Sequence, residues 1–161
     1  MRLPAGRKIA IAWRGGDQLH FFGQNRSAPL SEIERLLAVP DITSMGIERQ
    51  IDDATALRLA SKFNFVDVGQ EAAHDLADLA AVLALCDMVV TVDCTSAHLA
   101  GAMGKPSFVL LNDVAMWFWH QADRSPWYPT LNLVRQQEPA NWRDVVDRII
   151  AALGRAEKLA A

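Results

Sequence analysis

Four residues of the stretch VDCTSAHLAGAMGKP have side chains suited to binding an anion. Asp93, Thr95, Ser96 and His98 directly follow an apolar run, and small residues come after them. This order is typical of a strand that feeds a helix. The first turn of a helix offers free N–H groups and the positive end of the helix dipole, which favour phosphate. The spacing suggests a phosphate site. An alternative is that Asp93 only caps a helix and His98 is a packed, partly buried side chain.

Further polar residues stand where other apolar runs end. Arg14, Asn25 and Arg26 flank a long loop after the first run, and a cation there could pair with a diphosphate. Glu48 follows the second run and could accept ribose hydroxyls. Nothing in the sequence supplies a base for Cys94, which we interpret as a packing residue. No motif anchors a catalytic base, so the catalytic residues stay unassigned.

Apolar runs alternate with amphipathic segments along the whole chain. The runs predicted as strands are Lys8–Trp13, Ile42–Ile47, Phe65–Val68, Met88–Val92, Ser107–Leu111 and Leu131–Val134. Helices are predicted from Ser31 as N-cap, with Glu34 completing a capping box, over 53–63, over 76–86, from 94 onward and over 142–153. Strands that are apolar throughout indicate a parallel sheet covered by helices on both faces.

The predicted fold class is therefore α/β. Residues 1–161 form a single Rossmann-like three-layer domain with a mostly parallel sheet of about six strands. In such sheets, ligands bind beyond the carboxyl ends of the strands, where the polar residues above are found.

Aromatic residues concentrate in MWFWHQADRSPWYP, residues 116–129. They could stack on a base or a sugar, or dock a partner domain. More often such a cluster is a small core beneath a long loop. Lys105, in the connection before Pro106, is expected to be only solvated.

The bulk properties exclude several classes of protein. The chain has 161 residues, 51% of them hydrophobic, and a net charge of −3, so nucleic acid is not expected as a partner. Two cysteines without a CxxC pair argue against a disulfide framework and structural zinc. The apolar segment IAIAW is too short for a signal-peptide core or a membrane span. We therefore expect a soluble cytoplasmic protein that needs no metal.

The stretch VVTVDCTSAHLAGAMGKP resembles the D-T-x-x-x-H-L-A-x-A-x-G-x-P segment of the ADP-heptose:lipopolysaccharide heptosyltransferase family. It is more similar still to the glycosyltransferase-like domains that follow tetratricopeptide repeats in many bacterial proteins. Supporting segments occur in the same order: IAWRGG, NRSAPL, DLADLAAVLALCDMVV, DRSPWYPTLNLVRQ and NWRDVVDRI. The resemblance implies the C-terminal, nucleotide-sugar-binding half of a GT-B glycosyltransferase.

The resemblance also implies roles for single residues. Asp93 corresponds to an aspartate near the donor sugar or its phosphates, and Thr95 and Ser96 fall in the diphosphate-binding turn. His98 matches the motif histidine. Arg26 matches a basic residue that approaches the phosphates.

Other positions have a second interpretation or depart from the family pattern. Leu79 falls on the adenine side in heptosyltransferases, although it fits a core position equally well. Cys94 stands where these proteins usually have threonine or alanine. The sequence GIERQ around Glu48 differs from the expected SLQKG-like sequence, and NDVAMWFWH differs from the usual acidic-Trp-Arg-Trp pattern.

Two functions follow from this resemblance. The first is a donor-binding domain for a nucleotide-diphosphate sugar, whose acceptor half is absent from this chain. Hexosyl or heptosyl transfer then requires an N-terminal half or a partner, such as a tetratricopeptide-repeat protein. The second is a degenerate domain that acts as a binding or interaction module without catalysis. A nucleotide-sugar epimerase or hydrolase is a weaker third reading, because no GxGxxG fingerprint is present. The face that would dock the missing half could also support a homodimer.

Overall fold

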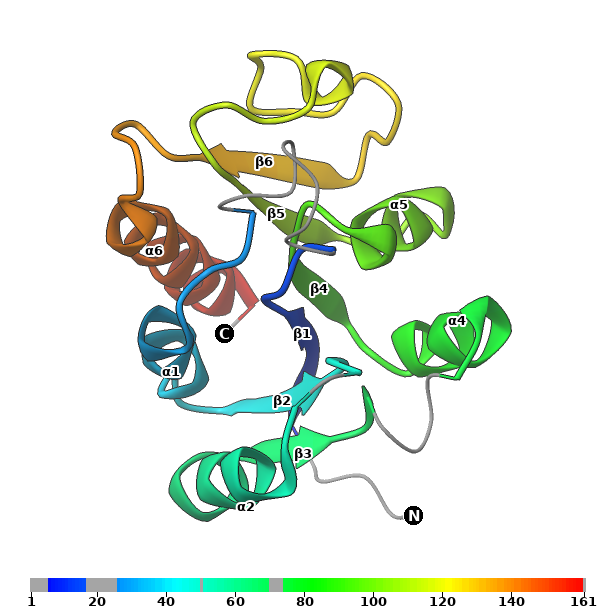
Figure 1. The fold of residues 1–161 in the computed structure, drawn as a ribbon, viewed down its shortest axis with the longest axis vertical. Coiled ribbons are helices and arrows are strands. Elements are labelled where there is room, and N and C mark those ends of the chain that lie inside the picture. The colour runs from blue at the N-terminus through cyan, green and yellow to red at the C-terminus, as the bar shows by residue number, and fades with distance from the viewer. Residues whose placement is uncertain (1–5, 17–25, 50, 70–73, 161) are drawn as a thin grey trace.

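Six parallel strands form a single sheet in the computed structural model, which describes residues 6–16, 26–49, 51–69 and 74–160. The strand order is β3-β2-β1-β4-β5-β6, and helices cover both faces of the sheet (Figure 1). This order is the one found in Rossmann folds. The predicted α/β fold class is confirmed.

The elements lie close to their predicted positions. The strands are β1 Arg7–Ala12, β2 Ile42–Gly46, β3 Phe65–Asp67, β4 Met88–Val92, β5 Ser107–Leu111 and β6 Leu131–Arg135. The helices are α1 Leu30–Leu37, α2 Asp53–Lys62, α4 Leu76–Ala84, α5 Thr95–Ala102 and α6 Trp142–Ala160, with a 3-10 turn η1 at Trp117–Trp119. None of the helices that the structure describes combines the length and the apolar character needed to cross a bilayer.

Both faces of the sheet are buried, which explains the continuous apolar runs. Ile9 and Ile11 of β1 pack with residues of α1 and α6, whereas Ala10 and Ala12 pack against α4 residues such as Leu83. A third cluster joins Val109 and Leu111 of β5 to residues of η1. The two main faces therefore pack against different helices, as expected for a parallel sheet.

The start of α1 differs from the prediction. The helix begins at Leu30, and Pro29 occupies the N-cap position with φ −60° and no side-chain cap. Proline has no N–H to satisfy and a φ suited to the helix, so the helix starts before Ser31 and the predicted capping box does not form. Glu34 instead pairs with Arg58 and Lys62 of α2, and the hydrogen bond from Arg58 is the main reason that the Glu34 pKa is lowered.

Lys105 makes structural contacts, so the prediction that it is only solvated is wrong. Its Nζ donates hydrogen bonds to the carbonyl oxygens of Ala84, at 3.0 Å, and Cys86, at 2.7 Å. These carbonyls lie at and just beyond the end of α4, where helix C-termini leave acceptors free. The chain leaving α5 turns at Gly104, whose φ is +67°, just before this lysine. Lys105 thereby joins the ends of the two helices.

The outer edge of β6 is covered by the chain itself. Arg124 forms an antiparallel bridge with Asn132, and the N–H of Leu133 donates to the Asp123 carbonyl at 2.8 Å. The segment 123–125 therefore occupies the side of β6 that faces away from β5. The opposite edge of the sheet is β3, which has three residues.

Candidate functional site

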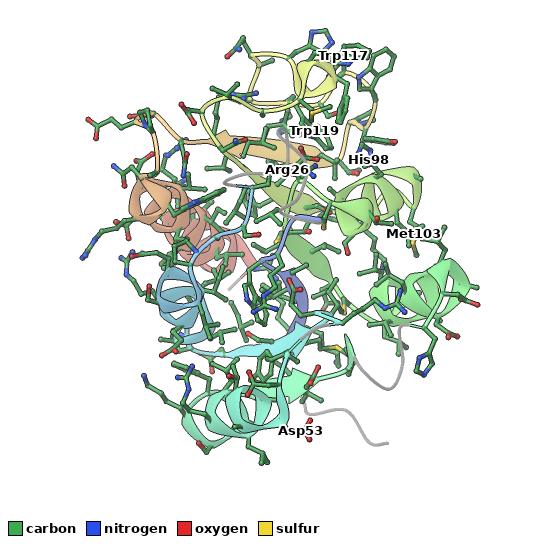
Figure 2. The ribbon with its side chains drawn as sticks, in the orientation of Figure 1. Arg26, Asp53, His98, Met103, Trp117 and Trp119 are labelled. Atoms are coloured by element: carbon green, nitrogen blue, oxygen red, sulfur yellow. The ribbon has the colours of Figure 1, made fainter. Side chains whose placement is uncertain are left out.

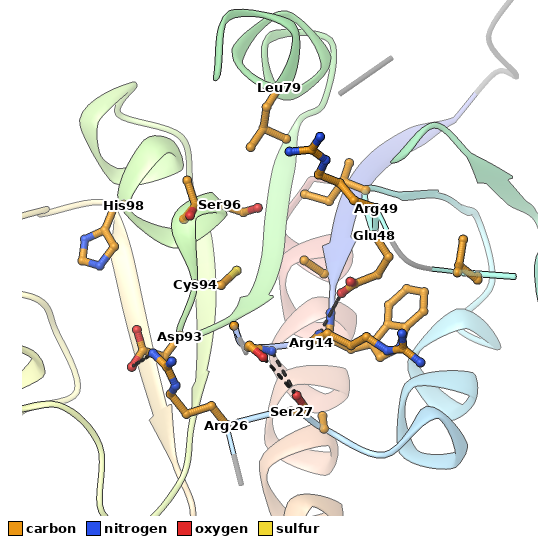
Figure 3. A pocket seen from close by; sticks show the side chains of 18 of the residues that line it. Arg14, Arg26, Ser27, Glu48, Arg49, Leu79, Asp93, Cys94, Ser96 and His98 are labelled. Atoms are coloured by element: carbon orange, nitrogen blue, oxygen red, sulfur yellow. Dashed lines mark hydrogen bonds and ion pairs between the residues drawn. The ribbon is translucent and has the colours of Figure 1, made fainter. Parts of the chain in front are cut away.

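A cleft opens beyond the carboxyl ends of β1, β2 and β4, where the strand order changes direction. We call it the switch-point cleft. Its volume is about 1430 Å³, larger than the roughly 300–1,000 Å³ usual for small-molecule sites. Eight of the residues that the sequence suggested for ligand binding line this cleft: Arg14, Arg26, Glu48, Leu79, Asp93, Thr95, Ser96 and His98. Figure 3 labels all of them except Thr95. The fold thus brings together side chains from distant parts of the chain, from Arg14 to His98.

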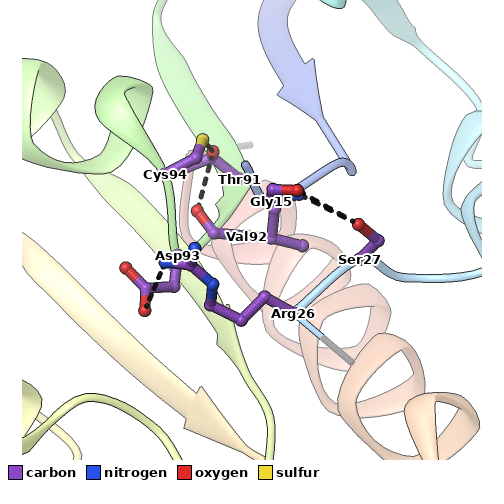
Figure 4. A network of polar contacts seen from close by, with 7 residues as sticks. All are labelled: Gly15, Arg26, Ser27, Thr91, Val92, Asp93 and Cys94. Atoms are coloured by element: carbon purple, nitrogen blue, oxygen red, sulfur yellow. Dashed lines mark hydrogen bonds and ion pairs between the residues drawn. The ribbon is translucent and has the colours of Figure 1, made fainter. Parts of the chain in front are cut away.

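Arg26 and Asp93 form a loose ion pair at the floor of the cleft. Arg26 Nη1 lies 3.6 Å from Asp93 Oδ2, and the Asp93 side chain is only 3% exposed (Figure 4). Asp93 Oδ2 and Arg26 Nε are both buried, and neither has a hydrogen-bond partner. Buried polar atoms are nearly always hydrogen-bonded in native proteins. This pair therefore retains binding capacity on both its cationic and its anionic side.

Gly15 allows the loop carrying Arg26 to approach the sheet. A Cβ at Gly15 would lie 2.7 Å from Arg26 Cβ and 3.4 Å from the Asp93 carbonyl oxygen. The Gly15 N–H donates to Ser27 Oγ at 3.1 Å, and the Ala28 N–H donates to the Trp13 carbonyl at 2.9 Å. These bonds hold the returning loop against the end of β1.

The N-terminus of α5 faces the cleft without a side-chain cap. Cys94 is the N-cap residue, Thr95 is exposed and Ser96 is 7% exposed. The Cys94 sulfur lies 3.2 Å from Thr91 Oγ1, and its side chain packs against the core clusters, in agreement with its interpretation as a packing residue. The uncapped first turn and its dipole can bind an anion.

Glu48 is almost completely buried and is tied to the backbone of the neighbouring strand. Its Oε1 accepts hydrogen bonds from the N–H groups of Trp13 and Arg14, the latter at 2.8 Å. Burial raises the Glu48 pKa, and the two backbone hydrogen bonds oppose this effect. One carboxylate oxygen therefore fixes the end of β1. The predicted contact with ribose hydroxyls would use the other oxygen.

His98 stands on the wall of the cleft nearest the connection between β5 and β6. Its ring stacks on Trp119 with centroids 5.0 Å apart, and its Nδ1 lies 3.4 Å from the Tyr128 hydroxyl. The aromatic segment 116–129 has two parts. Trp119 is fully buried in a small core, as predicted for such a cluster, whereas Trp117 and Trp127 are 76% and 59% exposed (Figure 2).

Leu79 is half-buried on α4, where it both packs against the core and lines the cleft. Arg49, Met116 and Phe118 also line the cleft. The sequence did not single out Arg49, whereas Met116 and Phe118 belong to the aromatic segment 116–129 that was considered for stacking on a base or a sugar. Arg49 could have been found, because it follows Glu48 at the carboxyl end of a strand. Phe118 was found only as part of its segment, because a turn without periodicity does not show which of its side chains reaches the cleft. Asn25, considered for the phosphate site, lies outside the described residues.

The described part of the chain contains no group of three or more His, Cys, Asp or Glu side chains that could hold a metal ion. The charged side chains that line the cleft are those of arginine, aspartate and glutamate. Their arrangement suits a ligand that carries both anionic groups and hydroxyls. Anionic groups bind to cations and N–H donors, whereas hydroxyls donate to carboxylates.

Comparison with known proteins shows a family match and similarity to other proteins, among them a bacterial protein and a solved structure. Residues 43–153 match glycosyltransferase family 9 (heptosyltransferase). The chain is 26% identical to Protein FlbA of Caulobacter vibrioides over 156 residues, which are 94% of this chain and 26% of FlbA. The crystal structure of a family 9 glycosyl transferase from Veillonella parvula DSM 2008 matches with a TM-score of 0.64 and 12% identity, over 93% of this chain and 46% of that one.

These comparisons agree with the fold and with the heptosyltransferase resemblance. The chain spans about a quarter of the length of FlbA and less than half of the Veillonella chain. Association with tetratricopeptide repeats and the position of this domain within a longer protein stay predictions. Since the family match covers well over half of its residues, the chain belongs to glycosyltransferase family 9, the heptosyltransferase family.

Proposed function

We propose that this chain is the donor-binding domain of a glycosyltransferase and that its ligand is a nucleotide-diphosphate sugar. The observation that carries the proposal is the position of Arg26 in the same cleft as the uncapped N-terminus of α5. A guanidinium and a helix N-terminus together supply the charge-assisted hydrogen bonds that a diphosphate requires.

The remaining lining residues fit the other parts of such a ligand. In this proposal Glu48 receives ribose hydroxyls and Leu79 offers an apolar surface for the base, and both residues line the cleft. Asp93 and His98 lie toward the other end of the cleft, where they could contact the sugar (Figure 3). With Arg26 as the cation, binding of the diphosphate requires no metal ion.

Glycosyl transfer also requires an acceptor site and a general base, and no sequence motif in this chain assigns that base. In the reaction, a general base deprotonates the acceptor hydroxyl while positive groups stabilise the departing diphosphate. The second role suits Arg26, whereas Glu48 Oε1 is held by backbone N–H groups. We infer that the base and the acceptor site come from an N-terminal half, a tetratricopeptide-repeat partner or a second copy, acting in the cytoplasm on a hexosyl or heptosyl donor.

Calorimetric titration with ADP, GDP and UDP tests the proposal. We expect one nucleotide to bind in the micromolar-to-millimolar range. Arg26→Ala should weaken that binding about 10- to 150-fold, because hydrogen bonds to charged groups contribute roughly 1.5–3 kcal/mol. Arg143→Ala removes an exposed charge from α6, outside the cleft, and should leave the affinity unchanged.

The alternative function is a degenerate module that has lost donor binding, and Cys94 in the binding turn is the observation that favours it. Failure of all three nucleotides to bind the folded protein would support this alternative and contradict donor recognition by this domain. Equal losses in the Arg26→Ala and Arg143→Ala variants would show that binding depends on overall charge and not on the cleft.

A further inference from the structure

The ring of His98 contacts three aromatic side chains from the connection between β5 and β6, those of Phe118, Trp119 and Tyr128. Its centroid lies 5.0 Å from Trp119 with an interplanar angle of 20°, 5.4 Å from Phe118 and 5.9 Å from Tyr128. Trp119 is fully buried, so the stacked face of the histidine rests on a close-packed core. His98 itself is half-buried and lines the switch-point cleft. These aromatic contacts therefore fix the ring while leaving part of it accessible to a ligand.

Tyr128 makes a polar contact with this ring, and helix α5 fixes its position. The Tyr128 hydroxyl lies 3.4 Å from His98 Nδ1. This contact joins the SPWYP segment to the TSAH turn at the start of α5. A Cβ at Gly101 would lie 2.4 Å from Tyr128 Cγ, so the tyrosine ring packs directly on the helix that carries His98. The N–H of Tyr128 also donates to Ser125 Oγ at 3.2 Å. Packing of the Tyr128 ring and the hydrogen bond of its backbone N–H together hold the tyrosine beside His98.

We propose that Tyr128 is a positioning residue that sets the tautomer of His98. In the proposed arrangement the Tyr128 hydroxyl donates to Nδ1, and the neutral imidazole then carries its proton on Nε2. Nδ1 and Nε2 lie on different edges of the ring, and the Tyr128 contact occupies the Nδ1 edge. Nε2–H is the donor that remains for a ligand in the cleft.

The tautomer decides whether His98 attracts or repels such a ligand. With the proton on Nε2, the ring offers a hydrogen-bond donor to a phosphate or sugar oxygen. With the proton on Nδ1, the same edge offers a lone pair, which repels those oxygens. The identity of the ligand rests on the proposed function, whereas the tautomer is a property of the ligand-free chain.

The tautomer can be measured directly by ¹⁵N NMR on the ligand-free protein at pH about 8, where an ordinary histidine is neutral. The signals of His98 are assigned by their loss in a His98→Gln variant. We expect Nδ1 to resonate as an unprotonated nitrogen and Nε2 as a protonated one. In Tyr128→Phe, which keeps the ring packing, we expect a mixture of tautomers. Trp117→Phe changes an exposed aromatic of the same segment and should leave the His98 signals as in the wild type.

A protonated Nδ1 in the wild type, or unchanged His98 signals in Tyr128→Phe, would overturn the proposal. The protonation of Nδ1 is measured on the wild type, so this test remains valid even if Tyr128→Phe folds poorly. In a second arm, the affinity of the nucleoside diphosphate that binds best is measured. We expect Tyr128→Phe to lower it about 2- to 10-fold, as for loss of one hydrogen bond of roughly 0.5–1.5 kcal/mol. If none of ADP, GDP and UDP binds the wild type, the proposed function fails, and the NMR result still decides the role of Tyr128.

Discussion

At the scale of single residues, the site is built from polar groups that are buried but incompletely bonded. Asp93 Oδ2 and Arg26 Nε have no hydrogen-bond partner, and their mutual ion pair is long, at 3.6 Å. Such groups cost stability in a protein without ligand, because burial removes water that nothing fully replaces. A ligand that bonds to both would recover that cost on binding. The unsatisfied pair thus favours a binding role over a purely structural one.

Glu48 contributes both a hydrogen-bond acceptor and a buried charge at the end of β1, and two substitutions separate these contributions. Glu48→Ala removes the acceptor of two backbone N–H groups, one buried and one partly buried, and should lower the free energy of unfolding by about 1–3 kcal/mol. Glu48→Gln keeps an oxygen acceptor and removes the buried charge. Since burial raises the Glu48 pKa in the folded protein, wild-type stability falls relative to the glutamine variant as the pH rises through that pKa.

We therefore expect Glu48→Gln to equal or exceed the wild type in stability at neutral pH, and to lose any advantage below the ordinary pKa of the carboxyl, about 4.3. Urea denaturation at several pH values measures both variants. A glutamine variant that is as unstable as the alanine variant at neutral pH would show that the carboxylate charge itself is needed to hold the end of β1.

At the scale of helices and strands, the sequence predicted the strands better than the connections. Continuous apolar runs such as Met88–Val92 can hardly be anything but buried strands, and all six strands end within one residue of their predicted limits. The start of α1 was misplaced because Pro29 imposes its own backbone angle. The contacts of Lys105 and Phe118 could not be predicted, since they depend on how distant segments meet and leave no periodic signal. Seven of the eight cleft residues were found because they follow strand ends, which share one edge in this fold, whereas Leu79 of α4 was found through the family resemblance.

The glycines of two helices predict opposite effects of the same substitution. Gly101→Ala should lower the free energy of unfolding by about 1–3 kcal/mol, because the new methyl group overlaps the Tyr128 ring. Gly154 lies within α6 and has nothing within 4 Å of an added Cβ. Gly154→Ala should raise the free energy of unfolding by about 0.5–1 kcal/mol through helix propensity. Thermal denaturation of both variants measures this, and a neutral Gly101→Ala would contradict the close packing of Tyr128 on α5.

At the scale of the whole molecule, the segment that matches the family does not contain the whole structural unit. The match covers residues 43–153, whereas β1 lies at Arg7–Ala12 in the middle of the sheet, between β2 and β4. Arg26 also precedes the matched segment. Both the central strand and the proposed phosphate-binding cation therefore come from the part of the chain that precedes the family match.

A chain shortened to begin at residue 42 should not fold cooperatively. Removal of β1 exposes the paired edges of β2 and β4 and takes Ile9 and Ile11 out of the core. We expect the shortened chain to lose its near-UV circular dichroism and its sharp thermal transition, both of which the 161-residue chain should show. A cooperative transition in the shortened chain would mean that the sheet can close without its central strand.

The segment 123–125 beside β6 has a consequence for self-association. Exposed edge strands are templates on which further strands of other molecules can add, leading to fibrils. Here one edge of the sheet is already taken by Arg124 and its neighbours, so growth of fibrils from that side requires this segment to detach first. The other edge offers only the three residues of β3. The molecule thereby carries its own protection against polymerisation of its sheet, and loosening of the 123–125 segment is the event that would remove it.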